Sequence, residues 1–215
     1  MEKDIFIIGA GLYGAVIFEL AQHCGYNIKG FYDDDLKKSN KKIFDVSVLG
    51  TTKYLFNKNI NLDNVNFAVA IGANHVRRRL SEKIREKGGI TPSLIHKNAE
   101  ISPSALIGKG VFIHAKAIIW TKVIIENDCI ISPHVLISHH AIMKKGSFVS
   151  NMSVLGTNVF LGKDALVGMG STVMSGINSI GDNVIIGAGS VVIRDVAPNT
   201  TVAGVPAKVI KRKGV

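Results

Sequence analysis

Cysteine is scarce in this chain of 215 residues, which contains only Cys24 and Cys129. The two stand in separate regions, so the pattern excludes a disulfide framework and a cysteine-rich zinc site, and we expect reduced packing residues. Long apolar runs are missing as well, because no stretch reaches 18 uninterrupted apolar residues. The first four residues, Met1–Asp4, lack the positive-then-apolar layout of a signal peptide. We therefore expect a cytoplasmic protein without membrane insertion.

Aromatic residues make up only 7% of the chain, although its net charge is +10. Part of the basic charge is clustered, in Arg77–Arg79 and in Lys208, Lys211, Arg212 and Lys213. No aromatic residues are interleaved with these clusters and no nucleic-acid-binding motif is recognisable, so nucleic acid is not an expected partner. Such clusters are commonly solvated surface. The sharper interpretation is that the ligands are small polyanions, such as a nucleotide diphosphate and coenzyme A.

The dominant pattern is an aliphatic residue at every sixth position between Ile101 and Val196. These residues are Ile101, Ile107, Ile113, Ile119, Ile125, Ile131, Ile137, Met143, Val149, Leu155, Leu161, Val167 and Val173 and, after one inserted residue, Ile180, Ile186 and Val192. Four positions after each stands a small or aliphatic residue, as at Ala105, Ala117, Cys129, Ala141, Ser153, Ala165 and Ile177. Neither a helix nor an alternating strand has this period, whereas a left-handed parallel β-helix of hexapeptide repeats does. Three hexads form one triangular coil, so the stretch predicts about five coils.

The first part of the chain has the pattern of a small α/β domain. A buried strand over residues 4–8 leads into the glycine turn Gly9–Gly14 and a helix to about His23, and a second strand over residues 28–32 ends in Asp33–Asp35. A glycine turn at a helix N-terminus suits a phosphate, and an acidic residue after the second strand suits a ribose. Two alternatives remain: a tight turn that only packs the helix on the sheet, and an NAD site. The unit is half of a full dinucleotide fold, which favours a mononucleotide-sized site.

These patterns divide the chain into three parts. We predict a half-Rossmann α/β domain over residues 1–97, a left-handed β-helix domain over residues 98–196 and a capping tail over residues 197–215.

Histidine is the side chain best suited to carry chemistry here. His134, His139 and His140 lie within seven residues, and their hexad positions predict that His139 and His140 project outward from the middle of a face. Imidazole suits proton transfer near neutral pH, although an exposed histidine is often only surface. Zinc-binding hexapeptide-repeat carbonic anhydrases use two histidines five residues apart with a third two coils earlier. Asn98 stands at that third place, so we expect no metal.

Five segments together carry a family resemblance: Gly9–Gly11, Phe31–Asp35, Ser138–His140, Ile186–Gly189 and Gly204–Lys208. With these segments the chain resembles the bacterial sugar O-/N-acyltransferases of the sialic acid O-acetyltransferase and nucleotide-aminosugar N-acetyltransferase type. The resemblance covers nearly the whole chain. It implies a homotrimer that binds acetyl-CoA in the groove between two β-helices and a nucleotide sugar on the N-terminal domain.

The resemblance also implies the catalytic residues. His139 stands where relatives have the general base, and the backbone N–H of Thr157, one coil on, is the expected oxyanion donor. His140 stands where relatives usually have the Asp or Glu that orients the base, and a second imidazole cannot supply a fixed negative charge. Either another carboxylate reaches the site, or the acceptor amine arrives deprotonated, or activity is weak.

Two further residue sets follow from the resemblance. The positions that correspond to the nucleotide-sugar site of relatives are Gly11, Leu12, Tyr13, Asp33, Asp34 and Gly72, and those that correspond to the acetyl-CoA site are Phe148, Met169 and Gly187.

The expected function is acetyl-CoA-dependent N-acetylation of a nucleotide-linked amino-deoxysugar for surface glycan synthesis. The first alternative is O-acetylation of a sugar such as sialic acid. The second is a non-catalytic trimer that binds a nucleotide sugar.

Overall fold

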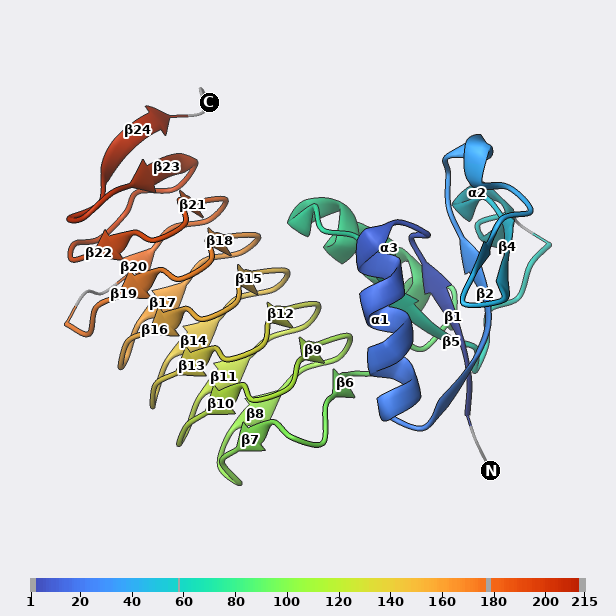
Figure 1. Cartoon of the computed structure of the whole chain (residues 1–215), viewed down its shortest axis with the longest axis horizontal. Helices are drawn as coiled ribbons and strands as arrows, with labels where there is room; N and C mark the ends of the chain where they lie inside the picture. The colour runs from blue at the N-terminus through green and yellow to red at the C-terminus, as the bar shows by residue number, and fades with distance from the viewer. Residues whose placement is uncertain (1–2, 58, 177–178, 213–215) are drawn as a thin grey trace. The chain divides into compact units, whose positions relative to one another are not determined.

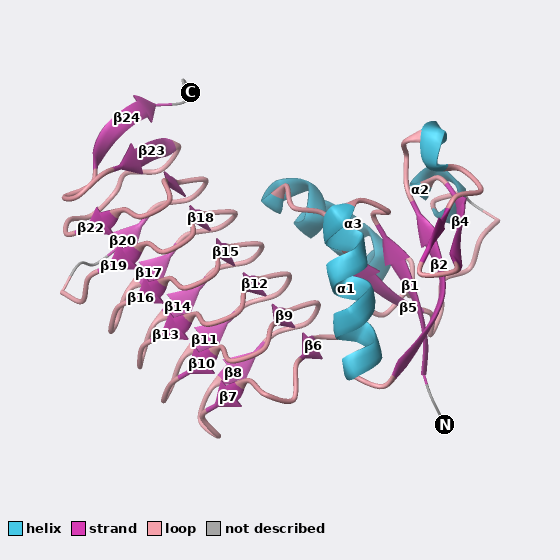
Figure 2. Cartoon of the chain, viewed as in Figure 1, coloured by secondary structure: helices cyan, strands magenta, loops and turns pink. Residues whose placement is uncertain are grey.

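The computed structural model describes residues 3–57, 59–176 and 179–212, and it separates into two compact units at residues 94 and 95 (Figure 1). Each unit has its own fold. Helices occur only in the first unit, and short strands make up the second, as Figure 2 shows for the described residues. The predicted fold class, an α/β domain followed by a β-helix, is confirmed.

The first unit is a five-stranded sheet with helices on both faces. Its elements are β1 (Lys3–Ile8), α1 (Leu12–His23), β2 (Tyr26–Tyr32), the 3₁₀ helix η1 (Leu36–Lys38), β3 (Lys42–Ile43), β4 (Val46–Gly50), α2 (Thr52–Leu55), β5 (Asn66–Val69) and α3 (Asn74–Glu86). The strand order is β3-β4-β2-β1-β5, and all neighbours are parallel except β3 and β4. From β1 the chain runs outward to β2 and to the pair β3 and β4, and it then returns to β5 on the other side of β1. The carboxyl ends of β1 and β5 therefore form the switch point where α/β sheets bind ligands.

Alternation along the strands divides the core of this sheet between two faces. On one face Ile8, Phe67 and Val69 pack with Leu55 of α2 and Ile84 of α3. On the other face the ring of Phe31 stacks with that of Phe18 of α1 at a centroid distance of 6.1 Å. Strands buried on both faces are typical of a parallel sheet covered by crossover helices.

The second unit is a parallel β-helix with three faces. The first face contains β6 (Leu94–Ile95), β9 (Phe112–Ile113), β12 (Ile130–Ile131), β15 (Phe148–Val149), β18 (Leu166–Val167), β21 (Ile185–Ile186), β23 (Thr200–Ala203) and β24 (Lys208–Arg212). The second face contains β7 (Glu100–Ile101), β10 (Ile118–Ile119), β13 (Leu136–Ile137), β16 (Val154–Leu155), β19 (Thr172–Val173) and β22 (Val191–Val192). The third face contains β8 (Leu106–Ile107), β11 (Ile124–Ile125), β14 (Ile142–Met143), β17 (Phe160–Leu161) and β20 (Ser179–Ile180).

The six-residue register produces this prism directly. Ile119 pairs with Ile137 and Ile137 with Leu155, so each register residue lies 18 positions from its partners on the same face. The register residues between Ile113 and Val192 are buried inside the coils, together with most of the small residues that precede the strands. Ile177 lies outside the described residues.

Between residues 109 and 170, each corner of the prism is a two-residue turn whose second residue has a positive φ. The value of φ lies between 56° and 60° at Lys116, Lys122, His134 and His140. At another corner, glycine takes the same place as Gly146. Non-glycine residues seldom adopt this region, so the stacking of coils imposes it on them. At the end of the chain, β23 continues the first face in parallel and β24 pairs with it antiparallel.

Candidate active site

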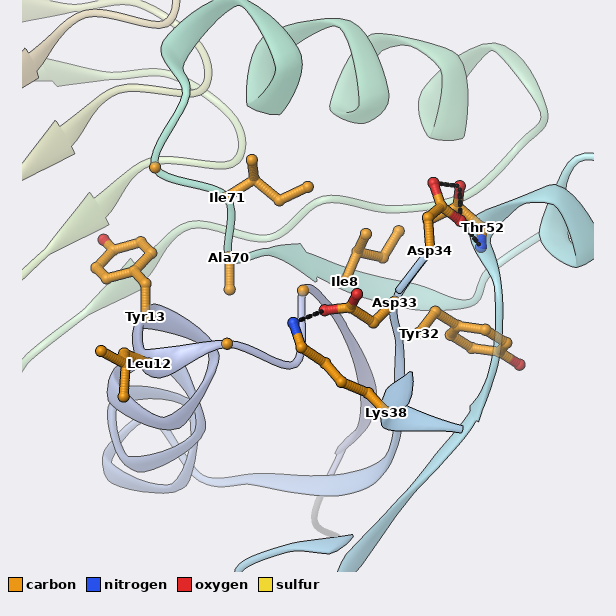
Figure 3. Close-up of a pocket in the computed structure, with 13 residues that line it drawn as sticks. Ile8, Leu12, Tyr13, Tyr32, Asp33, Asp34, Lys38, Thr52, Ala70 and Ile71 are labelled. Carbon is orange, nitrogen blue, oxygen red and sulfur yellow. Dashed lines mark hydrogen bonds and ion pairs between the residues drawn. The ribbon is translucent and has the colours of Figure 1, made fainter. Parts of the chain in front are cut away.

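A cavity of about 380 Å³ opens at the carboxyl ends of β1, β2 and β5 (Figure 3). Its lining comprises Ile8, Gly9, Gly11, Leu12, Tyr13, Tyr32, Asp33, Asp34, Lys38, Thr52, Ala70, Ile71 and Gly72. The structure thus brings together around one cavity all six residues that the sequence assigned to the nucleotide sugar. Its volume and position fit a nucleotide-sized ligand at a switch point.

The glycine turn is shaped by two close approaches of the backbone. A Cβ on Gly9, whose φ is 104°, would lie 2.6 Å from the carbonyl oxygen of Ala70, the residue that follows β5. A Cβ on Gly14 would lie 2.1 Å from the carbonyl oxygen of Gly9. Only hydrogen atoms fit at these two places, so the motif holds α1 tightly against the end of β1. Gly11, which precedes α1, has no side-chain cap, and the start of the helix borders the cavity.

Asp33 ties the glycine turn to the end of β2. Its carboxylate accepts hydrogen bonds from the backbone N–H of Ala10 at 2.7 Å and of Asp35 at 2.9 Å, and from Nζ of Lys38 at 2.9 Å. Burial favours the neutral acid, but the hydrogen bond from Lys38 and those from the two backbone N–H groups outweigh it and lower the pKa of Asp33. Asp33 is therefore a fixed anion at the wall of the cavity, with a lysine ammonium beside it.

Asp34 is held by the start of α2. The backbone N–H and the hydroxyl of Thr52 both donate to its carboxylate, at 2.8 Å and 2.9 Å (Figure 3). The sequence reasoning missed Thr52 and Lys38 because neither belongs to a motif. Each reaches the cavity through a contact with an aspartate of the acidic run.

Arg77 corrects one expectation from the sequence. The basic cluster Arg77–Arg79 was expected to be a solvated face or a polyanion site, but Arg77 is only 1% exposed. Its guanidinium donates to the carbonyl of Ile71 at 3.0 Å and to Oδ1 of Asn74 at 2.9 Å, which fixes the turn that carries Gly72. Burial raises the pKa of Tyr13 well above its usual value, while the charge of Arg77 acts in the opposite direction. The phenol of Tyr13 is therefore neutral at the cavity wall.

In the second unit, His139 and His140 form the corner between β13 and β14. They are the two turn residues, so the prediction of a mid-face position was wrong: the hexad register identifies the inward residue but not where the chain bends. His134 lies at the preceding corner, between β12 and β13, so strand β13 separates it from the other two histidines.

The ring of His139 contacts residues of its own coil and of both neighbouring coils. Its Nδ1 lies 3.0 Å from Nδ1 of His140, and its Nε2 lies 3.3 Å from Oγ1 of Thr157 in the next coil. The indole of Trp120, in the preceding coil, is stacked on it with ring centroids 6.3 Å apart and planes 10° apart. Trp120 carried no signal in the sequence, because its position relative to His139 depends on how the coils stack.

The backbone N–H of Thr157, the expected oxyanion donor, donates to Oγ of Ser175 at 2.9 Å. Ser175 occupies the same corner one coil further on, and its hydroxyl can rotate. It is therefore an acceptor that a developing oxyanion would have to replace.

The three residues assigned to acetyl-CoA lie elsewhere on the prism. Phe148 is the outward residue of β15 on the first face, and Gly187 follows β21 on that face. Met169 is the first turn residue at the corner between β18 and β19. The corner of His139 joins the second and third faces, so it lies opposite the first face. A single β-helix does not bring these residues to His139.

Comparison with known proteins agrees with both halves of the chain. Residues 4–84 match the PglD N-terminal domain, and residues 104–139 match six repeats of the bacterial transferase hexapeptide. The acetyltransferase domain of PglB from Neisseria gonorrhoeae is 31% identical with a TM-score of 0.88, over 97% of this chain and 100% of that one. The chain belongs to the bacterial sugar acyltransferase family with hexapeptide repeats. Its β-helix is accordingly the left-handed kind.

Two other members of the sugar acyltransferase family are also similar. PerB from Caulobacter crescentus, solved in complex with CoA and GDP-perosamine, is 29% identical with a TM-score of 0.86, over 100% of this chain and 99% of that one. UDP-N-acetylbacillosamine N-acetyltransferase from Bacillus subtilis is 33% identical over 53% of this chain, a segment that spans 52% of that protein. The chain thus spans about half the length of this curated relative.

Two kinds of feature are absent from the described residues of this sugar acyltransferase. Within residues 3–57, 59–176 and 179–212, no helix is both long and apolar enough to cross a bilayer. The same residues contain no group of three or more His, Cys, Asp or Glu side chains placed to hold a metal ion.

Proposed function

We propose that this protein is an acetyl-CoA-dependent N-acetyltransferase that acts on a nucleotide-linked amino sugar. The observation that carries the proposal is the similarity to PerB, a protein solved with CoA and GDP-perosamine, over the whole of this chain. The site geometry supports it, because a nucleotide-sized cavity lies in one unit and an outward histidine lies at a corner of the other. Acetyl-CoA and nucleotide sugars meet in the cytoplasm, where we place the enzyme, and surface glycans are the expected destination of the product.

The nucleotide part of the substrate would occupy the cavity of the first unit. The start of α1, at Gly11, Leu12 and Tyr13, offers helix N–H groups and a positive dipole end to a phosphate. Asp33 and Asp34 are acceptors for ribose or base donors, and Gly72 leaves the opposite wall open, since a Cβ there would meet no atom within 4 Å. The same residues would bind any nucleoside diphosphate, so the identity of the base is left to experiment.

The reaction follows from the position of His139. Its Nε2 takes a proton from the acceptor amine as the amine nitrogen attacks the thioester carbonyl of acetyl-CoA. The C–N bond forms, the C–S bond breaks, and the thiolate of CoA receives the proton when the imidazolium releases it. Nε2 is assigned this role because Nδ1 contacts His140 within the same turn, whereas Nε2 contacts the Thr157 hydroxyl, whose place the acceptor amine would take.

The backbone N–H of Thr157 is proposed to stabilise the oxyanion of this reaction. It lies one coil from His139, and in the free protein its hydrogen bond to Oγ of Ser175 holds the N–H group in place. A backbone donor that is already oriented loses little free energy on reorganisation when negative charge develops nearby.

Acetyl-CoA is proposed to bind between two copies of the chain. The outward residues Phe148, Leu166 and Ile185 stack along the first face and suit the apolar part of the pantetheine arm, with Met169 and Gly187 at its edge. Because the corner of His139 lies opposite this face, a complete site needs the histidine of one copy and the first face of another. A cyclic trimer closes such heterologous contacts, which supports a homotrimer.

Thiol release from acetyl-CoA tests this function. The purified protein is mixed with acetyl-CoA and each of a panel of UDP-, dTDP- and GDP-linked amino sugars, and hydroxyl-bearing sugars serve as rival acceptors. We expect turnover with an amino sugar and a loss of at least about a hundredfold in kcat for His139→Asn. Turnover only with hydroxyl acceptors would contradict N-acetylation, and nucleotide binding without any turnover would indicate a binding protein.

The matched control for this test is His134→Asn. His134 is also a corner histidine, but it is the second residue of its turn, whereas His139 is the first, and it lies at another corner. We expect it to retain wild-type turnover, so an equal loss in both variants would count against a specific role for His139.

A further inference from the structure

Two imidazole rings share one hydrogen bond at the corner of His139. The Nδ1 atoms of His139 and His140 lie 3.0 Å apart, with the ring planes at 86° to each other. Two unprotonated nitrogens repel each other at this distance and two N–H groups clash, so the contact requires one hydrogen between the rings. In the part of the chain that the structure describes, no carboxylate contacts either ring.

The coils on both sides fix this contact. The backbone N–H of His140 donates to the carbonyl of Thr121 at 3.0 Å, and the N–H of Asn158 donates to the carbonyl of His139 at 3.1 Å. The ring of Trp120 is stacked with that of His139, with ring centroids 6.3 Å apart. The neighbouring coils therefore hold the backbone that carries both rings, and Trp120 stands beside one of them.

We infer that His140 is a positioning residue that replaces the missing acid by accepting the Nδ1 hydrogen of His139 and sharing its charge. The inference rests on the proposed function. With the hydrogen on Nδ1, the lone pair of His139 is on Nε2, which faces Thr157 and the next coil. With the opposite tautomer, Nε2 of His139 carries a hydrogen and cannot act as a base.

The number of N–H hydrogens on the two rings explains how a neutral imidazole can stabilise the protonated form of His139. Before reaction the pair holds two hydrogens, one between the rings and one on Nε2 of His140. When Nε2 of His139 takes the proton of the acceptor, the pair holds three hydrogens and one positive charge. The hydrogen between the rings can then lie on either Nδ1, so both imidazoles share the charge. A second added proton would place hydrogens on both Nδ1 atoms and break the contact.

The surroundings add little fixed charge to this pair. On the same corner, the preceding coil contributes Trp120, Thr121 and Lys122, and the following coil contributes Thr157 and Asn158. Lys122 is exposed and is the charged residue among these five.

The test compares Asn, Ala and Glu at position 140. Asn adopts positive φ readily and its Oδ1 can accept the Nδ1 hydrogen, so His140→Asn should retain kcat within about tenfold. His140→Ala removes the acceptor and should lower kcat by a further tenfold or more with KM nearly unchanged. The acidic limb of the kcat/KM profile should lie at the lowest pH for Ala, higher for wild type and highest for Glu, since an anion stabilises the imidazolium most.

Nuclear magnetic resonance of protein labelled with ¹⁵N in histidine gives a readout without turnover. The resonances of His139 should report a hydrogen on Nδ1 in the wild type and in His140→Asn, and a shift toward the Nε2 hydrogen in His140→Ala. Wild-type kcat, an unmoved pH profile and an unchanged tautomer in His140→Ala would overturn the inference. An inactive wild type that still shows the Nδ1 tautomer would instead contradict the proposed function alone.

Discussion

A single buried histidine makes the β-helix sensitive to acid. His114 on the first face is 7% exposed, and burial, with a smaller contribution from the charge of His96, lowers its pKa from 6.5 to about 4. The folded protein therefore keeps His114 neutral at pH values where the unfolded chain protonates it. In this window the unfolded state binds more protons, so stability rises with pH.

We predict that acidification from pH 7 to pH 5 costs about 2 kcal/mol of unfolding free energy through His114. The loss begins near pH 6.5 and is complete near pH 4. Urea unfolding at both pH values measures it, and His114→Asn should have a smaller pH dependence than the wild type. An equal pH dependence in the two proteins would show that other groups cause it.

The contrast between His114 and His139 shows how far the sequence predicts the environment of a single residue. Both are histidines in the hexapeptide stretch, but one is covered and the other lies at a turn beside Trp120. Their positions within the hexad predicted only part of this difference in burial, because the exposure of a side chain depends on which residues cover that face of the β-helix.

At the scale of an element, the glycine turn between β1 and α1 depends on one missing methyl group. Gly14 lies inside α1, where a Cβ would meet the carbonyl oxygen of Gly9 at 2.1 Å. Gly11 differs, since its Cβ would meet only Nζ of the Lys38 side chain, at 4.0 Å. The two glycines of one motif therefore serve different purposes.

We predict that Gly14→Ala destabilises the first unit by about 2 to 4 kcal/mol, because a backbone carbonyl cannot move aside as a side chain can. Gly11→Ala should change stability by less than about 1 kcal/mol. Thermal unfolding followed by circular dichroism compares them, and titration calorimetry with UDP and GDP tests binding. Equal stability of the two variants would show that α1 can shift away from β1.

Strands and turns could be predicted where a short stretch of sequence contains the pattern that specifies them. The register from Ile101 to Val192 predicted the coils because each register residue faces the same interior at a fixed interval. The turn of Gly9–Gly14 likewise predicted the strand, the helix and the cavity. The contacts of Lys38 with Asp33 and of Thr52 with Asp34 had no local signal, since they join segments through side chains. The corner position of His139 was missed for a related reason, because positive φ leaves no aliphatic pattern.

At the scale of the whole molecule, the division of residues between faces predicts complementation between defective copies. If a site takes His139 from one copy and the first face from another, two different inactive variants can form one intact site. His139→Ala destroys one half of the site, and Phe148→Glu combined with Met169→Glu destroys the other.

We predict that each variant alone is inactive and that an equal mixture, unfolded and refolded together, recovers about a quarter of wild-type activity. This fraction follows from random assembly in a ring, where each site needs the intact half from each of two adjacent copies. Thiol release measures the activity, and mixing without refolding is the control. A refolded mixture with no more activity than its components would show that each site lies within one copy.

The placement of β13 within its face affects how the corner of His139 comes apart. Of the six strands of the second face, β13 is third, with β7 and β10 before it and three strands after it. A solenoid frays from its ends, because each coil is held only by its two neighbours. Unwinding from either end must therefore melt at least two coils before it loosens His139, so amide hydrogens at this corner should exchange with solvent last.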